Sequence, residues 1–511
     1  MSKNKQTFLN MSTNMAAFFI QFVISFFVTR EVINVSGTEA YGFLSLANDF
    51  VMYLSVIASI INSVVSRFIA LELSRKNIDK ANQYFNSAFI ANIFLSIVFV
   101  VIGIGIIFYI DSLFNIDPNL IFDVQLTFAF TIATYIVTVL SGIFTVGTYV
   151  TNRLDINAVR NIFQYLLRLI VIVALFQIIG VKIYYVCFAS FIASLAVAVA
   201  NININKRLAP QLIYNVSLYK LSAIKDIISS GIWISISNLS TIFIRYLDLI
   251  VSNIFIGATA MGLLSSARTM PNYITSLVST LGGLFTPSFV ILYAHNSIDQ
   301  LIVQVKQSMK IMALILFVPI CGFIIFSDNF YFLWLDSLND NDHRVVVVLS
   351  TITVIQAFFN SVTSPVAQLS IVTNKVRLPV YVSFGCGVLN LVVVFFLLSF
   401  TNLGVYSIVL SSSSIMVLRY VIFNCWYGEH VLNTSLGQFS FQAFKLIPLI
   451  FILLIVFWAI NLYMSSSSWL GLILCCFVSG IIGYTISILY IFGPRKIHSI
   501  VFKGHGKHIR S

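Results

Sequence analysis

Charge is scarce in this sequence. Asp, Glu, Lys and Arg make up only 9% of the 511 residues, whereas an ordinary soluble domain carries about 25%. Hydrophobic residues make up 59%, and runs such as 90–110 and 446–464 are longer than the roughly ten alternating residues of an outer-membrane barrel strand. The sequence therefore excludes a set of soluble domains and predicts an all-α polytopic membrane protein.

Cysteine and histidine are also few and form no recognisable site. The six cysteines lie in or at the ends of apolar runs without Cys-x-x-Cys spacing, so neither a disulfide framework nor a thiolate metal site is expected. The six histidines fall in predicted loops or the C-terminal tail, outside any His-Glu-x-x-His or phosphate-loop pattern. We expect no metal, no cofactor and no enzyme activity. The enzyme alternative, a polysaccharide polymerase or lipid-linked glycosyltransferase, would need a larger external loop than the one predicted near 328–345.

Acidic residues are outnumbered by basic ones, 17 against 29, for a net charge of +12. Most Lys and Arg residues fall in alternate loops and in the termini, as the positive-inside rule describes, so no nucleic-acid partner is implied. Both termini are then predicted to be cytoplasmic, and the basic tail 494–511 would act as a stop signal facing the membrane lipids. Low-charge windows predict about fourteen transmembrane helices, at 11–33, 41–66, 84–110, 122–148, 161–180, 184–204, 227–252, 262–292, 308–327, 346–371, 378–400, 404–424, 446–464 and 468–492.

An internal repeat divides these helices. Residues 37–47 align with 257–267 at a constant offset of 220, and the same offset places Ile78-Asp79 on Ile298-Asp299. The matching pairs are Gly37/Gly257, Ala40/Ala260, Gly42/Gly262, Leu44/Leu264, Ser45/Ser265 and Ala47/Ala267. Because each copy holds an even number of spans, the two copies would be parallel in topology. We predict a six-helix lobe at 1–215, a second at 216–430, and two additional helices with a basic cytoplasmic tail at 431–511.

The loop 37–42 and the run from Arg245 to Pro271 resemble the polysaccharide-transporter, or Wzx-type, branch of the multidrug/oligosaccharidyl-lipid/polysaccharide (MOP) exporter superfamily. The resemblance implies a MATE-like fold whose central cavity opens alternately to each side of the bacterial cytoplasmic membrane. It implies a flippase whose cargo is an undecaprenyl-pyrophosphate-linked glycan, such as an O-antigen, capsule or exopolysaccharide repeat unit. A polysaccharide polymerase and a chain-length regulator are the partners implied.

Five charged residues are the candidate site. A charge in hydrocarbon costs roughly 2.5–3.5 kcal/mol, so intramembrane ionisable residues are functional candidates. Asp49, Arg245, Asp248 and Arg268 are each predicted about 6–12 Å inside the outer boundary of their spans, with Arg30 near the outer end of the first span. Arg268, Arg245 and Arg30 would bind the pyrophosphate and glycan, because guanidinium groups match phosphate oxygens. Asp49 and Asp248 would couple transport to Na⁺ or H⁺, or pair with the arginines.

Structural roles for these charges stay open. Arg245 and Asp248, three residues apart on one helix, would neutralise each other, and Arg268 would pair with Asp49 as a lock. Three further arginines, Arg67, Arg168 and Arg419, are predicted within two or three turns of the cytoplasmic ends of their spans, where their side chains reach the interface.

Two other transport functions stay open as well. A fourteen-span chain also fits a lipid II flippase. An ion-coupled multidrug exporter would be expected to place uncompensated acids in its cavity, whereas the excess at the shared depth here is basic or neutral.

Overall fold

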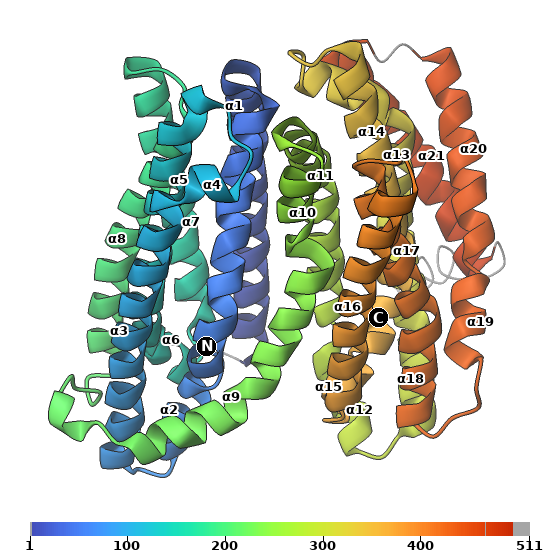
Figure 1. Cartoon of the computed structure of the whole chain (residues 1–511). Coiled ribbons are helices and arrows are strands. Elements are labelled where there is room, and N and C mark those ends of the chain that lie inside the picture. Colours follow the sequence, from blue (N-terminus) through green and yellow to red (C-terminus); the bar gives the residue numbers. More distant parts are fainter. Residues whose placement is uncertain (1–2, 465–466, 494–511) are drawn as a thin grey trace, which may run out of the picture. The chain divides into compact units, whose positions relative to one another are not determined.

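The computed structural model describes residues 3–464 and 467–493 and is all-helical over these ranges (Figure 1). The predicted tail at 494–511 lies outside the described residues. Thirteen helical stretches are long and apolar enough to cross a membrane, which confirms the polytopic helical fold. The chain divides into two compact units, Met1–Ser266 with Ser383–Leu391, and Ala267–Val382 with Val392–Ser511.

The first two predicted spans form one 60-residue helix, α1 (Lys3–Asn62), which is why thirteen stretches are found where fourteen spans were predicted. The helix is broken at Gly37, whose φ of 86° and ψ of 167° are non-helical. At 1.5 Å per residue, α1 is about 90 Å long, enough for two crossings of a core of about 30 Å. A side chain at position 37 would be strained at this φ, so glycine supplies the turn between the crossings.

The other helices of the first unit follow the predicted windows closely. Apolar runs of this length form helices, in which every backbone group is hydrogen-bonded within its own segment. Charged or turn-forming residues separate one helix from the next. They are α2 (Val65–Ser74), α3 (Ile78–Phe108), α4 (Ile110–Leu113), α5 (Ile121–Gly142), α6 (Val146–Val150), α7 (Leu154–Ile178), α8 (Ile183–Leu208), α9 (Leu221–Thr241), a π-helix (Ile242–Tyr246), α10 (Asp248–Phe255) and the start of α11 (Ala258–Gly283).

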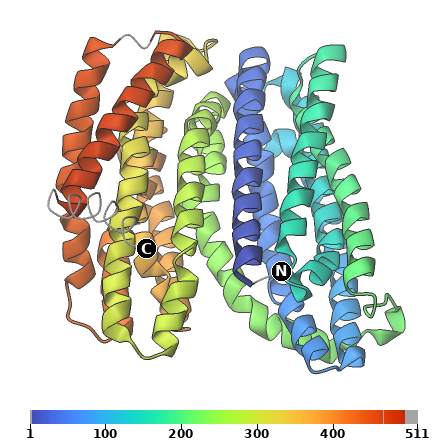
Figure 2. The ribbon, with the colours of Figure 1, turned by 180° about the vertical axis from the view of Figure 1, so that it is seen from behind.

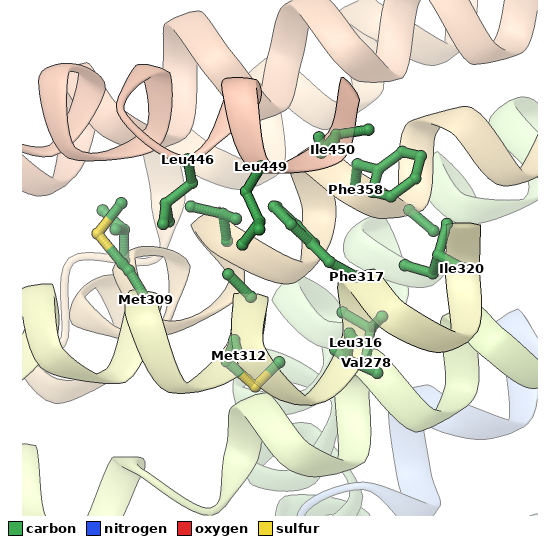
Figure 3. Packing of buried hydrophobic residues seen from close by; sticks show 14 of the residues in the cluster. Val278, Met309, Met312, Leu316, Phe317, Ile320, Phe358, Leu446, Leu449 and Ile450 are labelled. Carbon is green, nitrogen blue, oxygen red and sulfur yellow. The ribbon is translucent and has the colours of Figure 1, made fainter. Parts of the chain in front are cut away.

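The second unit contains most of the remaining helices, and its core is built around α13. Met309, Met312, Leu316 and Phe317 of this helix are buried against α14 and α20 (Figure 3). The additional helices α20 and α21 thus belong to this unit rather than standing apart. The helices are α12 (Thr286–Ala294), α13 (Ile298–Trp334), α14 (Asp340–Ala367), α15 (Leu369–Val372), α16 (Arg377–Phe400), α17 (Tyr406–Leu418), a π-helix (Arg419–Asn424), α18 (Cys425–Val431), α19 (Gln438–Phe444), α20 (Ile447–Tyr463) and α21 (Trp469–Phe492).

The predicted repeat is visible in the local backbone. The turn before α3 has Lys76 at φ 61°, and the turn before α13 has Asn296, its equivalent at the offset of 220, at φ 56°. The amide of the next residue bonds to an equivalent carbonyl in each copy, Asn77 N to Glu72 O at 2.9 Å and Ser297 N to Leu292 O at 3.0 Å. The same turn therefore recurs at equivalent positions, as a duplication requires.

A second repeated turn supports the duplication. Asn152 and Asn374 have φ of 55° and 56° at the turns before α7 and α16, where the sequence repeats as Thr-Asn followed by a basic residue. Arg153 N bonds to Thr148 O at 2.8 Å, and Lys375 N bonds to Ser370 O at 2.9 Å. The division into lobes at 1–215 and 216–430 stays a prediction, because the compact units follow packing rather than the repeat.

Candidate functional site

The five predicted site residues lie on four helical elements. Arg30 and Asp49 are in α1, Arg245 is in the π-helix Ile242–Tyr246, and Asp248 begins α10. Arg268 is in α11 and belongs to the second unit, whereas the other four belong to the first. The convergence of Arg268 with the other four stays a prediction.

Asp49 and Arg268 lie at similar distances from two equivalent glycines. Asp49 is twelve residues after Gly37 in α1, and Arg268 is eleven residues after Gly257, which precedes α11. Both glycines have positive φ, 86° and 136°, and so mark equivalent turns. At 1.5 Å per residue the two charges are about 18 and 17 Å along their helices. The common depth of the two charges in the membrane stays a prediction.

Arg245 occupies a local break that the sequence analysis missed. The window 227–252 was predicted to be one regular helix, but the chain forms a π-helix over Ile242–Tyr246 and bends before Asp248. Wide turns of this kind release backbone carbonyls and are frequent at functional sites. Tyr53 Oη donates to Tyr246 O at 2.5 Å, and Asn390 Nδ2 donates to Phe243 O at 3.4 Å. The break is thus fixed by hydrogen bonds from two other helices.

Arg245 and Asp248 do not lie on one regular helix, because the end of the π-helix and the bend at Leu247 fall between them. Their pairing with each other stays a prediction. Asp248 is buried at 6% exposure and Arg245 is half-buried. A run rich in β-branched residues, such as 241–246, gives no distinctive signal for a π-helix, which explains why the break was not predicted.

Equivalent small residues of the repeat meet directly where α1 and the start of α11 pack within the first unit. Ser265 Oγ donates to Ser45 Oγ at 2.6 Å. A Cβ added to Gly42 would lie 2.9 Å from the Cα of Gly262, and one added to Gly262 would lie 2.4 Å from Thr38 O. Any larger side chain at position 42 or 262 would therefore clash with the backbone of the other segment. Two segments that are equivalent in the predicted repeat thus contact each other through equivalent residues.

The chain that connects α8 to α9 is held by two asparagines of α3. Asn82 accepts from Ile213 N at 2.8 Å and donates to Gln211 O at 3.0 Å. Asn86 accepts from Asn215 N at 2.8 Å and donates to Ile213 O at 2.9 Å. The two side-chain amides replace the peptide groups of a paired strand, so the connection is fixed to the first unit. The predicted boundary between the lobes falls in this connection.

Arg168 and Arg419, predicted near the cytoplasmic ends of their spans, lie further from their helix ends than the predicted windows indicated. Arg168 is fourteen residues after the start of α7, about 21 Å along the helix. Arg419 begins the second π-helix, twelve residues before the end of the stretch Tyr406–Val431. The windows were too short because polar residues around 154–161 and 424–431 were interpreted as loop, whereas they are helical. Arg67, in contrast, lies in the short α2 beyond the end of α1.

An apolar cavity of about 370 Å³ lies in the second unit between α13, α20 and α21. Its lining is aromatic and aliphatic, with glycines at 322 and 480 that leave space open. The lining residues are Val318, Pro319, Gly322, Phe323, Phe326, Phe330, Phe457, Leu472, Cys476, Ser479, Gly480 and Tyr484. The cavity suits a hydrocarbon chain rather than a polar ligand, because nothing in this lining carries charge.

Metal chemistry finds no support in the described ranges. Among residues 3–464 and 467–493, no group of three His, Cys, Asp or Glu side chains is arranged to hold a metal ion. The six cysteines are free thiols, four of them buried.

Comparison with known proteins identifies the family. The profile of the family described as "Polysaccharide biosynthesis protein" matches residues 4–290. The uncharacterised membrane protein EpsK of Bacillus subtilis (strain 168) is 24% identical over 423 residues, which is 83% of each chain.

Solved structures share the fold at low sequence identity. The lipid II flippase MurJ, in an inward closed conformation, matches with a TM-score of 0.68 at 13% identity and covers 94% of this chain and 98% of its own. An inward-facing multidrug resistance MATE transporter of the MOP superfamily matches with a TM-score of 0.59 at 14% identity, covering 83% of this chain and 99% of its own. The MATE-like fold that the resemblance implied is confirmed.

Proposed function

We propose that this chain, which belongs to the polysaccharide biosynthesis protein family, is a flippase that moves a polyprenyl-pyrophosphate-linked oligosaccharide across the bacterial cytoplasmic membrane. The observation that carries the proposal is the placement of arginines deep in the spans of a MOP-superfamily fold, at Arg168, Arg268 and Arg419. Guanidinium groups held at such depth are costly and match the geometry of a pyrophosphate. The protein would bind and release this cargo without changing it covalently, and so would not be an enzyme.

The apolar cavity supports a lipid-linked cargo. Such a cargo carries a long prenyl chain that needs an apolar path while the pyrophosphate and sugars move through a polar one. The cavity between α13, α20 and α21 offers an aromatic and aliphatic lining, and two of these helices, α20 and α21, lie outside the predicted duplication. We assign it to part of the prenyl chain. Arg268, Arg245 and Arg30 are assigned to the pyrophosphate and glycan, and Asp49 and Asp248 to charge pairing or ion coupling.

Loss of the protein in its own host tests the proposal. Surface polysaccharide should disappear, the lipid-linked repeat unit should accumulate with its sugars on the cytoplasmic side, and a plasmid copy should restore both. Unchanged surface polysaccharide together with new drug sensitivity would contradict the proposal and favour an ion-coupled drug exporter.

A lipid II flippase is the second candidate, and the MurJ match over 94% of the chain is the observation that favours it. Expression in cells depleted of their own lipid II flippase discriminates between the two cargoes. Because a lipid-linked oligosaccharide repeat unit rather than the peptidoglycan precursor is the proposed cargo, growth should not be restored.

A further inference from the structure

The helix α7 carries two sharply different faces. Large apolar side chains that are 43–65% exposed recur every three or four residues along one face, which marks it as facing the lipid. They are Val159, Phe163, Leu166, Ile170 and Val173. Polar residues recur with the same spacing on the other side of the helix, which therefore faces away from the lipid. They are Asn157, Arg160, Asn161, Gln164 and Arg168.

The polar face of α7 packs against α1 and α8 but is only partly covered. Figure 2 shows α7, in teal, beside the first half of α1, in dark blue. Arg160, Asn161, Gln164 and Arg168 are all half-buried. A polar face that is turned from the lipid and yet remains accessible borders space that a ligand can enter.

Arg160 is oriented by neutral groups. Its Nη1 donates to Asn201 Oδ1 of α8, and its Nη2 donates to Asn161 Oδ1 at 3.1 Å. The Nε–H is buried and has no hydrogen-bond partner among the described residues. Two amide oxygens fix the guanidinium without neutralising its charge, so several of its five N–H donors remain for an anion.

Arg153, seven residues earlier, shows the ordinary alternative. Its Nε donates to Asp155 Oδ1 at 3.0 Å and its Nη2 to Asp155 Oδ2 at 3.0 Å. These hydrogen bonds and the charge of Asp155 raise the pKa of the Arg153 guanidinium. Asp155 is the only acidic residue in α7, and it is engaged by this exposed arginine. The contrast shows that Arg160 is held differently from a paired surface arginine.

Arg168 continues the charged face towards the middle of the membrane. It lies eight residues, or about 12 Å, beyond Arg160 along the helix. Tyr165 lies within electrostatic range of both guanidinium groups. An anionic group bound at Arg160, about 9 Å into the helix, would therefore meet a second guanidinium at greater depth.

We propose that the polar face of α7 is a binding site for lipid-borne phosphate, with Arg160 as the shallow contact and Arg168 as the deep one. The guanidinium fork matches phosphate oxygens, and Arg160 lies near one end of a span, where lipid headgroups reside. The phosphate can be the pyrophosphate of a prenyl-linked cargo or the headgroup phosphate of an anionic phospholipid. The pyrophosphate source rests on the proposed function, which also uses Arg168, whereas the phospholipid source requires only the phosphate chemistry.

Binding of farnesyl pyrophosphate to the purified full-length protein in detergent tests the site. The wild type should bind it, farnesol should not compete, and Arg160→Gln and Arg168→Gln should each weaken binding about tenfold, the loss expected for one charged hydrogen-bonding partner. Arg153→Gln is the matched control and should bind as the wild type does. Equal binding by the wild type and the double Arg160→Gln/Arg168→Gln variant, or no binding by the wild type, would overturn the proposal.

Two further arms separate the source of the phosphate and guard against misfolding. If dioleoyl phosphatidylglycerol displaces farnesyl pyrophosphate from the wild type, the site takes phospholipid headgroups; if it does not, the site is selective for the pyrophosphate. Arg160→Lys and Arg168→Lys keep the charge and should fold, but they should still bind severalfold more weakly because the fork is lost. Unchanged binding by both lysine variants would contradict the proposal. Polysaccharide export by the same variants is measured separately, so the site can fail while the proposed function stands.

Discussion

Arginine is the residue type on which transport of a pyrophosphate would depend. Arg168, Arg268 and Arg419 lie well inside their helices, where each charge costs roughly 2.5–3.5 kcal/mol. The sequence alone places Arg268 inside a predicted span, and α11 contains it. The helices that carry Arg168 and Arg419 are longer than predicted, because nearby polar residues on helix faces resemble loop residues when only local charge is considered.

Replacement of Arg268 separates binding from structure. Arg268→Ala should abolish surface-polysaccharide export without lowering the amount of inserted protein, because the arginine is costly to the bare fold. Arg268→Lys should retain part of the export, since the charge persists without the bidentate geometry. Membrane abundance and surface polysaccharide are measured on the same cells.

A purely structural role for Arg268 gives a different pattern. If it locks onto Asp49, each single substitution should reduce protein abundance, and the double Arg268→Ala/Asp49→Ala variant should recover it. Normal export by Arg268→Ala cells would remove Arg268 from the site.

The turns between helices recur at equivalent positions in the two copies of the repeat. The turns at Lys76 and Asn296 share the left-handed conformation and the same hydrogen bonds at equivalent positions, and the repeat in sequence predicted this correspondence. The π-helices at 242–246 and 419–424 were not predicted. Their wide turns depend on contacts with other helices, such as the Tyr53 bond to Tyr246 O, which no local pattern of residues encodes.

The cavity on α21 provides a test at the scale of one helix. A Cβ added to Gly480 meets no atom within 4 Å, so Gly480→Leu should fold and fill part of the apolar cavity. Export should fall severalfold while protein abundance stays unchanged, because the prenyl chain loses space. Gly105→Leu in α3, where a Cβ also meets nothing within 4 Å, is the control and should export normally. Equal export by both variants would remove the cavity from the path of the cargo.

For the whole molecule, composition and helix length were enough to predict the fold. Every predicted span overlaps a helix of the structure. The first two spans share one helix, α1, which is broken by the turn at Gly37. The arrangement of the charged residues could not be predicted equally well. It depends on how helices distant in sequence pack, as in the contact of Ser45 with Ser265.

The orientation of the chain is tested by labelling single cysteines with a membrane-impermeant maleimide in intact cells. In a background without the six native cysteines, Asn119→Cys should be labelled from outside and Lys76→Cys only after the membrane is opened, because basic loops stay in the cytoplasm. Both positions are exposed. The reverse pattern would place both termini outside.

Transport of a lipid-linked oligosaccharide in reconstituted liposomes tests the central claim most directly. Purified protein is incorporated into vesicles containing a polyprenyl-pyrophosphate-linked repeat unit, and the sugars exposed on the outer leaflet are measured with an impermeant lectin. Wild-type vesicles should expose sugar that was initially inaccessible, with Arg268→Ala vesicles remaining close to protein-free vesicles. Exposure at the same rate in wild-type and protein-free vesicles, with correctly folded protein present, would contradict the flippase function.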